Sequence, residues 1–259
     1  FRPERSHKDS IVALEMSGTH VTLDREDRVF MARVNESARR WKEMIHHTTT
    51  IATDRKELSV EERNLLSVAY KNYVAGRRSS WRVLCTLEHG QQVAQNVRRI
   101  QMVADMRRKV EGELEETCTN ILALLQDVLI PGAVSFEARV FYFKMQADYF
   151  RYIAEIVSGE RRKMAAEQAL LAYKTATEIA ETHLSGTHPL LLGLGLNFSV
   201  FYFEILSNRD KACKVAKDAF DGAIPGLDDL SEASYRDSTL LMKLLRDNLN
   251  RWSSQHDEQ

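Results

Sequence analysis

Apolar residues recur at three- and four-residue spacing through most of the chain, and this pattern predicts the fold class. The segments with this spacing are long, and only four prolines, at positions 3, 131, 189 and 225, interrupt them. No segment shows the sustained alternation of apolar and polar residues, bounded by turn dipeptides, that is typical of strands. The sequence therefore predicts an all-α protein.

The same spacing divides the chain into nine antiparallel helices joined by short links. Pro131-Gly132 and Pro225-Gly226 are stop signals, and Pro189 suits an early helical position, where its missing N–H costs nothing. The predicted helices cover residues 24–38, 40–51, 59–88, 93–130, 135–158, 160–183, 187–206, 208–224 and 231–253. We expect one domain over 23–254, an N-terminal extension over 1–22 that orders only by packing on something else, and a short tail over 255–259.

The predicted helix over 59–88 organises the rest of the chain. It opens with Ser59 and Glu62 in the spacing of a capping box, in which each side chain satisfies a backbone N–H of the other residue. Lys71 and Arg78 lie seven residues apart, two turns along one otherwise apolar face. Such cations reach solvent, pair with carboxylates of a neighbouring helix, or bind an anion.

Three other predicted helices also carry a few polar residues within an apolar face. The stripes are Lys144, Asp148 and Arg151 with Tyr152 alongside; Asn197, Val200 and Glu204; and Leu241, Leu244, Asn248 and Trp252. Each stripe alone is typical of an ordinary structural helix. Together they have the composition of an amphipathic groove, with a basic end for an anion, amides for a peptide backbone and an apolar wall.

Composition excludes several classes of function. The formal net charge is −1, so no global field favours nucleic acid or an anionic membrane, and the longest apolar run, 190–203, is too short to span a bilayer. The three cysteines are far apart and outside any CxxC spacing, which fits a reducing compartment; we expect the cytoplasm and also the nucleus as locations.

No catalytic or metal-binding motif appears in the sequence. Glu43-x-x-His46 resembles one half of a di-iron site, but the second copy is missing, and Asp228-Asp229 lacks a partner motif. We therefore expect neither an enzyme nor a bound metal or cofactor.

Four longer motifs resemble the signatures of the 14-3-3 family. They are RNLLSVAYKN at 63–72, RRSSWR at 77–82, LNFSVFY at 196–202, and YRDSTL at 235–240 continuing to LLRDNL at 244–249. The resemblance implies an all-α protomer of nine helices that forms one side of a cup-shaped dimer with an amphipathic ligand groove. Gly195, where alanine is usual, and Met106, where an aromatic residue is common, indicate a divergent member.

The resemblance also implies roles for the polar stripes. The protein would be an adaptor that binds client proteins through phosphoserine or phosphothreonine and regulates signalling. The phosphate would be held by Lys71, Arg78, Arg151 and Tyr152, with Asp148 keeping the cations oriented. The ligand main chain would be bound by Asn197 and Asn248, and the groove would be lined by Lys144, Glu204 and Trp252. Its apolar wall would consist of Leu196, Val200, Leu240, Leu241 and Leu244. The alternative is a helical scaffold that binds partners independently of phosphorylation.

The expected partners are phosphorylated client proteins and a second protomer, of this chain or of another family member. Nucleic acid and membrane insertion are not expected. We predict that the two short N-terminal helices cannot bury Val34, Ala38, Trp41 and Met44 within their own chain, so that they form a dimer interface. By resemblance this interface comprises Val34, Ala38, Arg40, Glu43, Ser80, Leu84, Leu87, Met106, Lys109 and Glu113, with Arg40 facing Glu113 and Glu43 facing Lys109.

Overall fold

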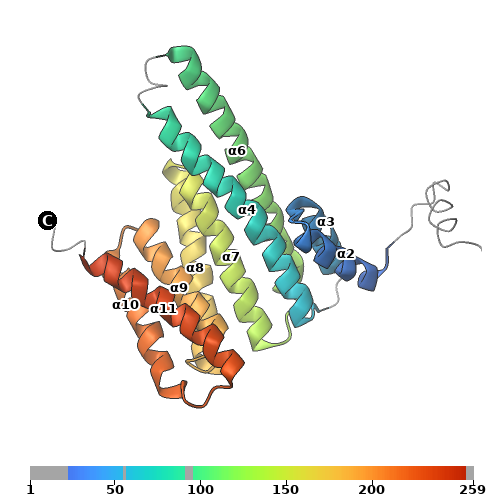
Figure 1. The fold of residues 1–259 in the computed structure, drawn as a ribbon, viewed down its shortest axis with the longest axis vertical. Helices are drawn as coiled ribbons and strands as arrows, with labels where there is room; N and C mark the ends of the chain where they lie inside the picture. Colours follow the sequence, from blue (N-terminus) through green and yellow to red (C-terminus); the bar gives the residue numbers. More distant parts are fainter. Residues whose placement is uncertain (1–22, 55–56, 91–95, 255–259) are drawn as a thin grey trace, which may run out of the picture.

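The computed structural model describes residues 23–54, 57–90 and 96–254, and over these ranges the protein is helical (Figure 1). The predicted extension, the tail and the residues just before 96 lie outside them. Nine α-helices and no strands occur in the described part, which confirms the all-α fold class. The α-helices are α2 (Arg25–Ser37), α3 (Trp41–Thr53), α4 (Val60–Glu88), α6 (Val97–Leu124), α7 (Phe136–Ile156), α8 (Gly159–His183), α9 (Pro189–Glu204), α10 (Arg209–Ala223) and α11 (Glu232–Ser254).

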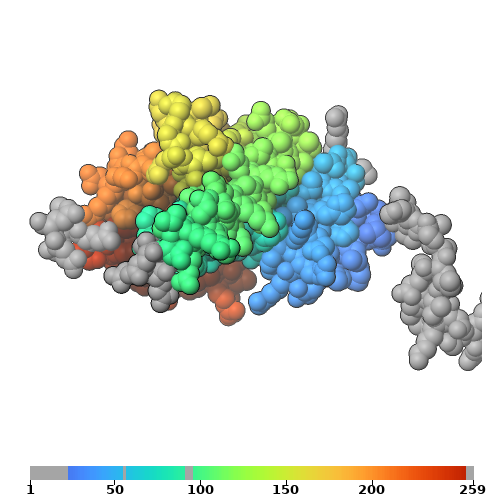
Figure 2. Space-filling model, turned by 90° about the horizontal axis from the view of Figure 1, so that it is seen from above, coloured from blue at the N-terminus to red at the C-terminus, as the bar shows by residue number. Residues whose placement is uncertain are grey.

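Helices that follow one another along the chain pack side by side. The closest pairs are α2 with α3, α4 with α6, α7 with α8, and α9 with α10. In Figure 1, α7 and α8 occupy the middle, and α4 and α6 extend beyond them. Figure 2 shows the N-terminal helices and the orange C-terminal helices at opposite ends of the described part. Any surface between them is therefore assembled from segments that are distant in sequence.

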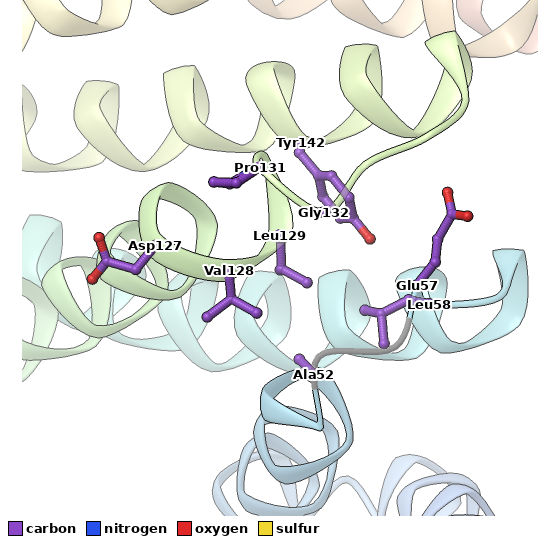
Figure 3. A pocket seen from close by; sticks show the side chains of 9 residues that line it. All are labelled: Ala52, Glu57, Leu58, Asp127, Val128, Leu129, Pro131, Gly132 and Tyr142. Carbon is purple, nitrogen blue, oxygen red and sulfur yellow. The ribbon is translucent and has the colours of Figure 1, made fainter.

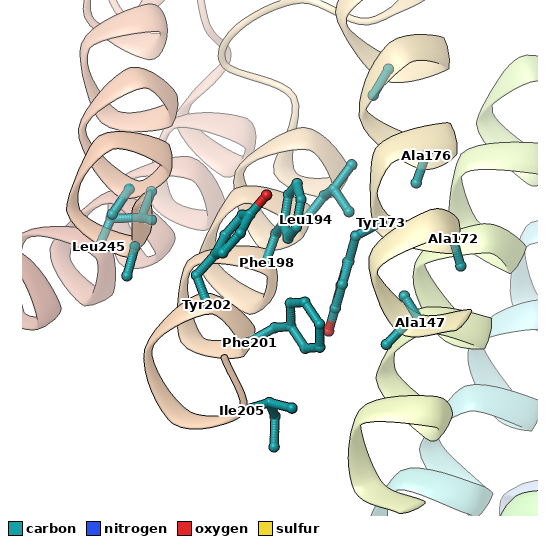
Figure 4. Packing of buried hydrophobic residues seen from close by; sticks show 14 of the residues in the cluster. Ala147, Ala172, Tyr173, Ala176, Leu194, Phe198, Phe201, Tyr202, Ile205 and Leu245 are labelled. Carbon is teal, nitrogen blue, oxygen red and sulfur yellow. The ribbon is translucent and has the colours of Figure 1, made fainter. Parts of the chain in front are cut away.

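Small side chains allow the central helices to approach closely. The buried face of α8 carries alanines at three- and four-residue spacing, from Ala165 to Ala180, and α7 contributes Ala147 and Ala154. Figure 4 shows the Tyr173 ring of α8 lying against the aromatic rings of α9 beside these alanines. This packing fixes α7, on which several of the predicted groove residues lie.

The capping box that opens α4 is present in the structure. Ser59 Oγ accepts a hydrogen bond from the backbone N–H of Glu62 at 3.2 Å, and Glu62 accepts one from the N–H of Ser59 at 2.8 Å. The Arg25 guanidinium also bonds both carboxylate oxygens of Glu62, at 2.7 and 3.0 Å. One carboxylate therefore caps α4 and ties α2 to it.

The predicted continuous helix up to residue 130 is wrong at its end. The α-helical hydrogen bonding stops at Leu124, and the chain continues as a π-helical turn, η1 (Leu125–Leu129), in which Ile130 N bonds Leu125 O at 2.9 Å. Pro131 has no N–H to continue the α-helical pattern, and Gly132 N closes the turn on Val128 O at 3.1 Å. A short 3-10 turn, η2 (Ile224–Gly226), likewise follows α10.

The prediction that the N-terminal helices cannot bury their apolar residues is wrong for Met44. This side chain is fully buried against Leu65 and Ala69 of α4, because α3 packs along that helix. Val34 remains 41% exposed, and Ala38 is exposed as well. The hairpin of α2 and α3 is thus anchored on its own chain but keeps an apolar outer face.

Candidate functional site

The predicted stripes meet around one cavity. Its volume is about 370 Å³, and α4, α7, α9 and α11 all contribute to its walls. The predicted residues that line it are Lys71, Lys144, Asp148, Arg151, Tyr152, Leu196, Asn197, Leu241 and Leu244. Four helices that are separate in sequence therefore place cations and an apolar wall in one hollow.

Asp148 is the centre of the buried part of the site. Its carboxylate accepts hydrogen bonds from Lys144 Nζ at 3.0 Å and from Tyr173 Oη at 2.6 Å. Asn197 Nδ2 donates to both carboxylate oxygens, at 2.8 and 2.9 Å. Arg151 donates to it at 3.3 Å and to the Tyr173 hydroxyl at 3.1 Å. Burial opposes the charge of this carboxyl, yet Lys144 and Arg151 outweigh burial and lower its pKa to about 2. Asp148 thus holds four side chains from three helices in fixed positions.

A second carboxylate, Glu155, pairs with two arginines of α4. Arg78 Nε donates to Glu155 Oε2 at 2.6 Å, and Arg82 donates to Oε1 at 2.6 and 3.1 Å. Burial works against the charge of Glu155, but the two guanidinium groups hold its pKa below its usual range. Glu155, Arg82 and Tyr173 were not among the site residues predicted from the sequence. Glu155 lies seven residues after Asp148, on the same face of α7, and Arg82 lies one turn after Arg78; this spacing could have identified both.

The two predicted phosphate-binding arginines lie beside one aromatic ring. The guanidinium carbon of Arg78 is 4.2 Å from the centroid of the Tyr152 ring, and that of Arg151 is 4.6 Å from it. Lys71 is exposed and makes no ion pair with any residue that the structure describes. Cations therefore outnumber the carboxylates at this end of the cavity, and the site carries a local positive charge that the net charge of the chain conceals.

The apolar wall is present, with differences among its members. Leu196, Val200 and Leu241 are partly buried, whereas Leu240 is 60% exposed and Leu244 is 43% exposed. Asn248 is partly buried and Glu204 is exposed. Trp252 is only 3% exposed and stacks on Phe203, with ring centroids 4.9 Å apart, so it packs in the core; its predicted place in the groove stays a prediction.

The residues predicted for a dimer interface fall in two groups, one on the hairpin of α2 and α3 and the other on the packed pair α4 and α6. Leu87 is 46% exposed and Met106 is 52% exposed, Ser80 and Lys109 are exposed, and Leu84 is partly buried. Within the single chain, Arg40 pairs with Glu43, and Glu113 pairs with Arg77. The predicted pairs of Arg40 with Glu113 and of Glu43 with Lys109 would require these contacts to exchange.

A second cavity, of about 290 Å³, lies between the end of α3, the turn at η1 and α7 (Figure 3). Its charged lining residues are Glu57 and Asp127, and its other lining residues are apolar apart from the buried Tyr142. Among the described lining residues there are two carboxylates and no cation, which disfavours an anionic ligand. The cationic cavity at α4 and α7 is therefore the better candidate site.

Within the described ranges, no group of three metal-ligating side chains is arranged to hold a metal ion. No helix in the same part of the chain combines the length and the apolar character that crossing a membrane requires.

The fold and the cavity define a class, an all-α protein with a cationic, amphipathic groove. Comparison with known proteins identifies the family: its model, described as 14-3-3 protein, matches residues 31–253. The checkpoint signal transducer rad24 of Schizosaccharomyces pombe is 51% identical over 233 residues, 90% of this chain and 86% of that protein. The 14-3-3-like protein G-BOX factor 14 lambda of Arabidopsis thaliana is 52% identical over 241 residues, 92% and 97% of the two chains. Protein BMH1 of Saccharomyces cerevisiae is 50% identical over 239 residues, 92% and 90%.

This chain belongs to the 14-3-3 family. The proteins of this family are adaptors that bind client proteins in signalling, and they are not enzymes.

Proposed function

We propose that the protein binds client segments that carry phosphoserine or phosphothreonine, and that the phosphate lies at the cationic end of the cavity. The observation that supports this proposal best is the excess of cations there: Arg78 and Arg151 lie beside the Tyr152 ring and Lys71 lines the same cavity, while Asp148 and Glu155 are the carboxylates that pair with these arginines among the described residues. A phosphate group brings about −1.5 to −2 charges and three acceptor oxygens, which suits forked guanidinium donors.

The hydrogen bonds within the site leave suitable groups available for a ligand. Arg78 uses its Nε on Glu155, and its terminal nitrogens make no hydrogen bond with the described residues. The Tyr152 hydroxyl is likewise unbonded within this part of the chain. Asn197 donates its Nδ2 to Asp148, which leaves its amide oxygen to accept an N–H of the ligand main chain. The site can thus receive an anion and the adjoining peptide backbone together.

The test is one peptide titrated in phosphorylated and unphosphorylated form by calorimetry. We expect the phosphorylated form to bind about a hundredfold tighter, since several charge-assisted hydrogen bonds depend on it. Equal affinity for the two forms would instead support the alternative, a helical scaffold that binds partners independently of phosphorylation.

The outer apolar face of the N-terminal hairpin supports a second part of the proposal, a two-fold dimer. Exposed apolar side chains such as Val34, Leu87 and Met106 would be buried between protomers, and the rim ion pairs would add under about 1 kcal/mol each. In sedimentation, we expect the 29.7 kDa chain to run as a dimer at micromolar concentration. Leu87→Asp should dissociate it, whereas Leu171→Asp, at a 61% exposed position of α8, should not. A monomeric parent would remove the dimer proposal.

A further inference from the structure

Glu155 differs from Asp148, the other carboxylate of the site, in its hydrogen-bond partners. Both of its oxygens accept hydrogen bonds, one from Arg78 and the other from Arg82, and both arginines lie on α4 rather than on its own helix. No other residue in the described ranges bonds this carboxylate. Its side chain is 15% exposed, and that of Arg82 is 56% exposed, so this pair borders solvent. Glu155 therefore supplies a negative charge directly behind Arg78, whose guanidinium lies over the ring of Tyr152, a lining residue of the cavity.

The contacts of Arg78 show what this charge does. Glu155 accepts a hydrogen bond from Nε of Arg78. This bond orients the Arg78 side chain, while the terminal nitrogens of its guanidinium remain available. Arg82 is bonded through both Nε and Nη2 to one oxygen of Glu155. One carboxylate thus orients two guanidinium groups and cancels part of their charge before any ligand arrives.

We propose that Glu155 determines the specificity of the site by presenting an internal carboxylate, so that the site accepts a phosphate dianion and rejects a client aspartate or glutamate. This inference rests on the proposed phosphate-dependent function.

The physical basis is the charge that remains for the ligand. A client carboxylate brings one negative charge, and Glu155 already neutralises part of the charge of the α4 arginines. The binding free energy that such a carboxylate gains therefore does not offset the cost of ordering the peptide. A phosphate brings nearly twice the charge and a third oxygen, so it can contact Arg78, Arg151 and Lys71 at once. Discrimination between the two anions therefore depends on how much positive charge Glu155 leaves.

The experiment uses one peptide in three forms, with phosphoserine, serine or glutamate at the same position. Each form is titrated against the parent chain and against Glu155→Gln, which keeps an acceptor for Arg78 but removes the charge. We expect Glu155→Gln to bind the glutamate peptide about tenfold tighter than the parent does. The phosphopeptide should gain less, so that the ratio of the two affinities falls.

The matched control is Glu88→Gln. Glu88 also forms a partly buried ion pair, with Arg107 at 2.7 Å, but Arg107 is not one of the arginines that lie beside the Tyr152 ring. This variant should keep the affinity ratio of the parent. Thermal melting of each variant checks that the fold is retained.

Two results would overturn the inference. One is an unchanged ratio in Glu155→Gln; the other is a phosphopeptide affinity that falls while the glutamate peptide still fails to bind, which would mean that Glu155 only orients the arginines. A parent chain that does not distinguish phosphoserine from serine would overturn the proposed function as well. If the parent does distinguish them, but the ratio of phosphopeptide to glutamate-peptide affinity is unchanged in Glu155→Gln, only this inference is overturned.

Discussion

Asp148 and Glu155 lie two turns apart on one face of α7, and each pairs with an arginine of the site, yet their surroundings differ. Asp148 is enclosed on all sides by its partners: they come from α7, α8 and α9, its own side chain is 11% exposed, and that of Arg151 beside it is 8% exposed. Glu155 borders solvent, and its only partners in the described part of the chain are Arg78 and Arg82 of α4. The two carboxylates thus form one closed network and one open network.

The difference between the two networks indicates different functions. A buried charge that loses its partner is costly, because nothing else can solvate it, so the Asp148 network is coupled to the stability of the fold. The Glu155 side chain is 15% exposed, but that of its partner Arg82 is 56% exposed, so water can replace this partner and the pair contributes less to stability. The open network can therefore exchange partners with a ligand without loss of the fold.

Removal of Asp148 should have the largest effect and tests this contrast directly. Asp148→Ala leaves the buried Arg151 guanidinium without its counter-charge, and we expect a loss of about 3–5 kcal/mol in the free energy of unfolding. Glu155→Ala should lose only about 1 kcal/mol, since Arg82 can turn to solvent. Urea denaturation measures both values, and equal losses would contradict the distinction between a closed and an open network.

Arg78→Ala should separate binding from stability. We expect the affinity for a phosphopeptide to fall about ten- to a hundredfold, because one charge-assisted donor is worth about 1.5–3 kcal/mol. The melting temperature should stay close to that of the parent.

Two other variants complete this comparison. Arg151→Ala should lose affinity and stability together, since Arg151 belongs to the closed network. Arg161→Ala, at an exposed arginine that pairs with Glu115 away from the cavity, should change neither. An Arg78→Ala protein that binds as the parent does would remove Arg78 from the site.

The low pKa of Asp148, about 2, predicts acid sensitivity. In the unfolded chain an aspartate titrates near 3.9, so the stability that its depressed pKa contributes is present above that value. This contribution, about 2–3 kcal/mol, should be lost as the pH falls toward 2. The parent should lose stability between pH 4 and about 2 more steeply than Asp148→Asn does in urea denaturation. Parallel curves for the two proteins would show that Asp148 is not held charged by its partners.

Val200→Asp should have the smallest effect and tests the groove wall apart from both networks. Val200 is partly buried on α9, and a carboxylate there would be desolvated when a peptide lies against it. We expect about tenfold weaker binding of the phosphopeptide by calorimetry, while the phosphate-binding residues stay intact. Leu171→Asp on the outer face of α8 is the control. Unchanged binding by Val200→Asp would mean that the ligand does not contact α9.

The helices, and the residues that share a face on each of them, follow from the amino-acid sequence alone. Ser59 and Glu62 cap α4 through bonds between near neighbours, and Lys71 and Arg78 fall on one side because the helical period places them there. These features depend on residues a few positions apart, so the pattern was sufficient to predict them. The π-helical turn at Leu125–Leu129 shows the limit, because the stop signal at Pro131 predicts an end but not the conformation just before it.

The helices that meet, and the partner that each charged side chain receives, depend on how the whole chain packs. Tyr173 reaches Asp148 because the alanines of α8 allow close packing on α7, and Met44 is buried because α3 lies along α4. Glu155 pairs with Arg78 across 77 positions of sequence. A helical period fixes the direction of a side chain on its own helix, but the packing of the whole chain determines what stands opposite to it.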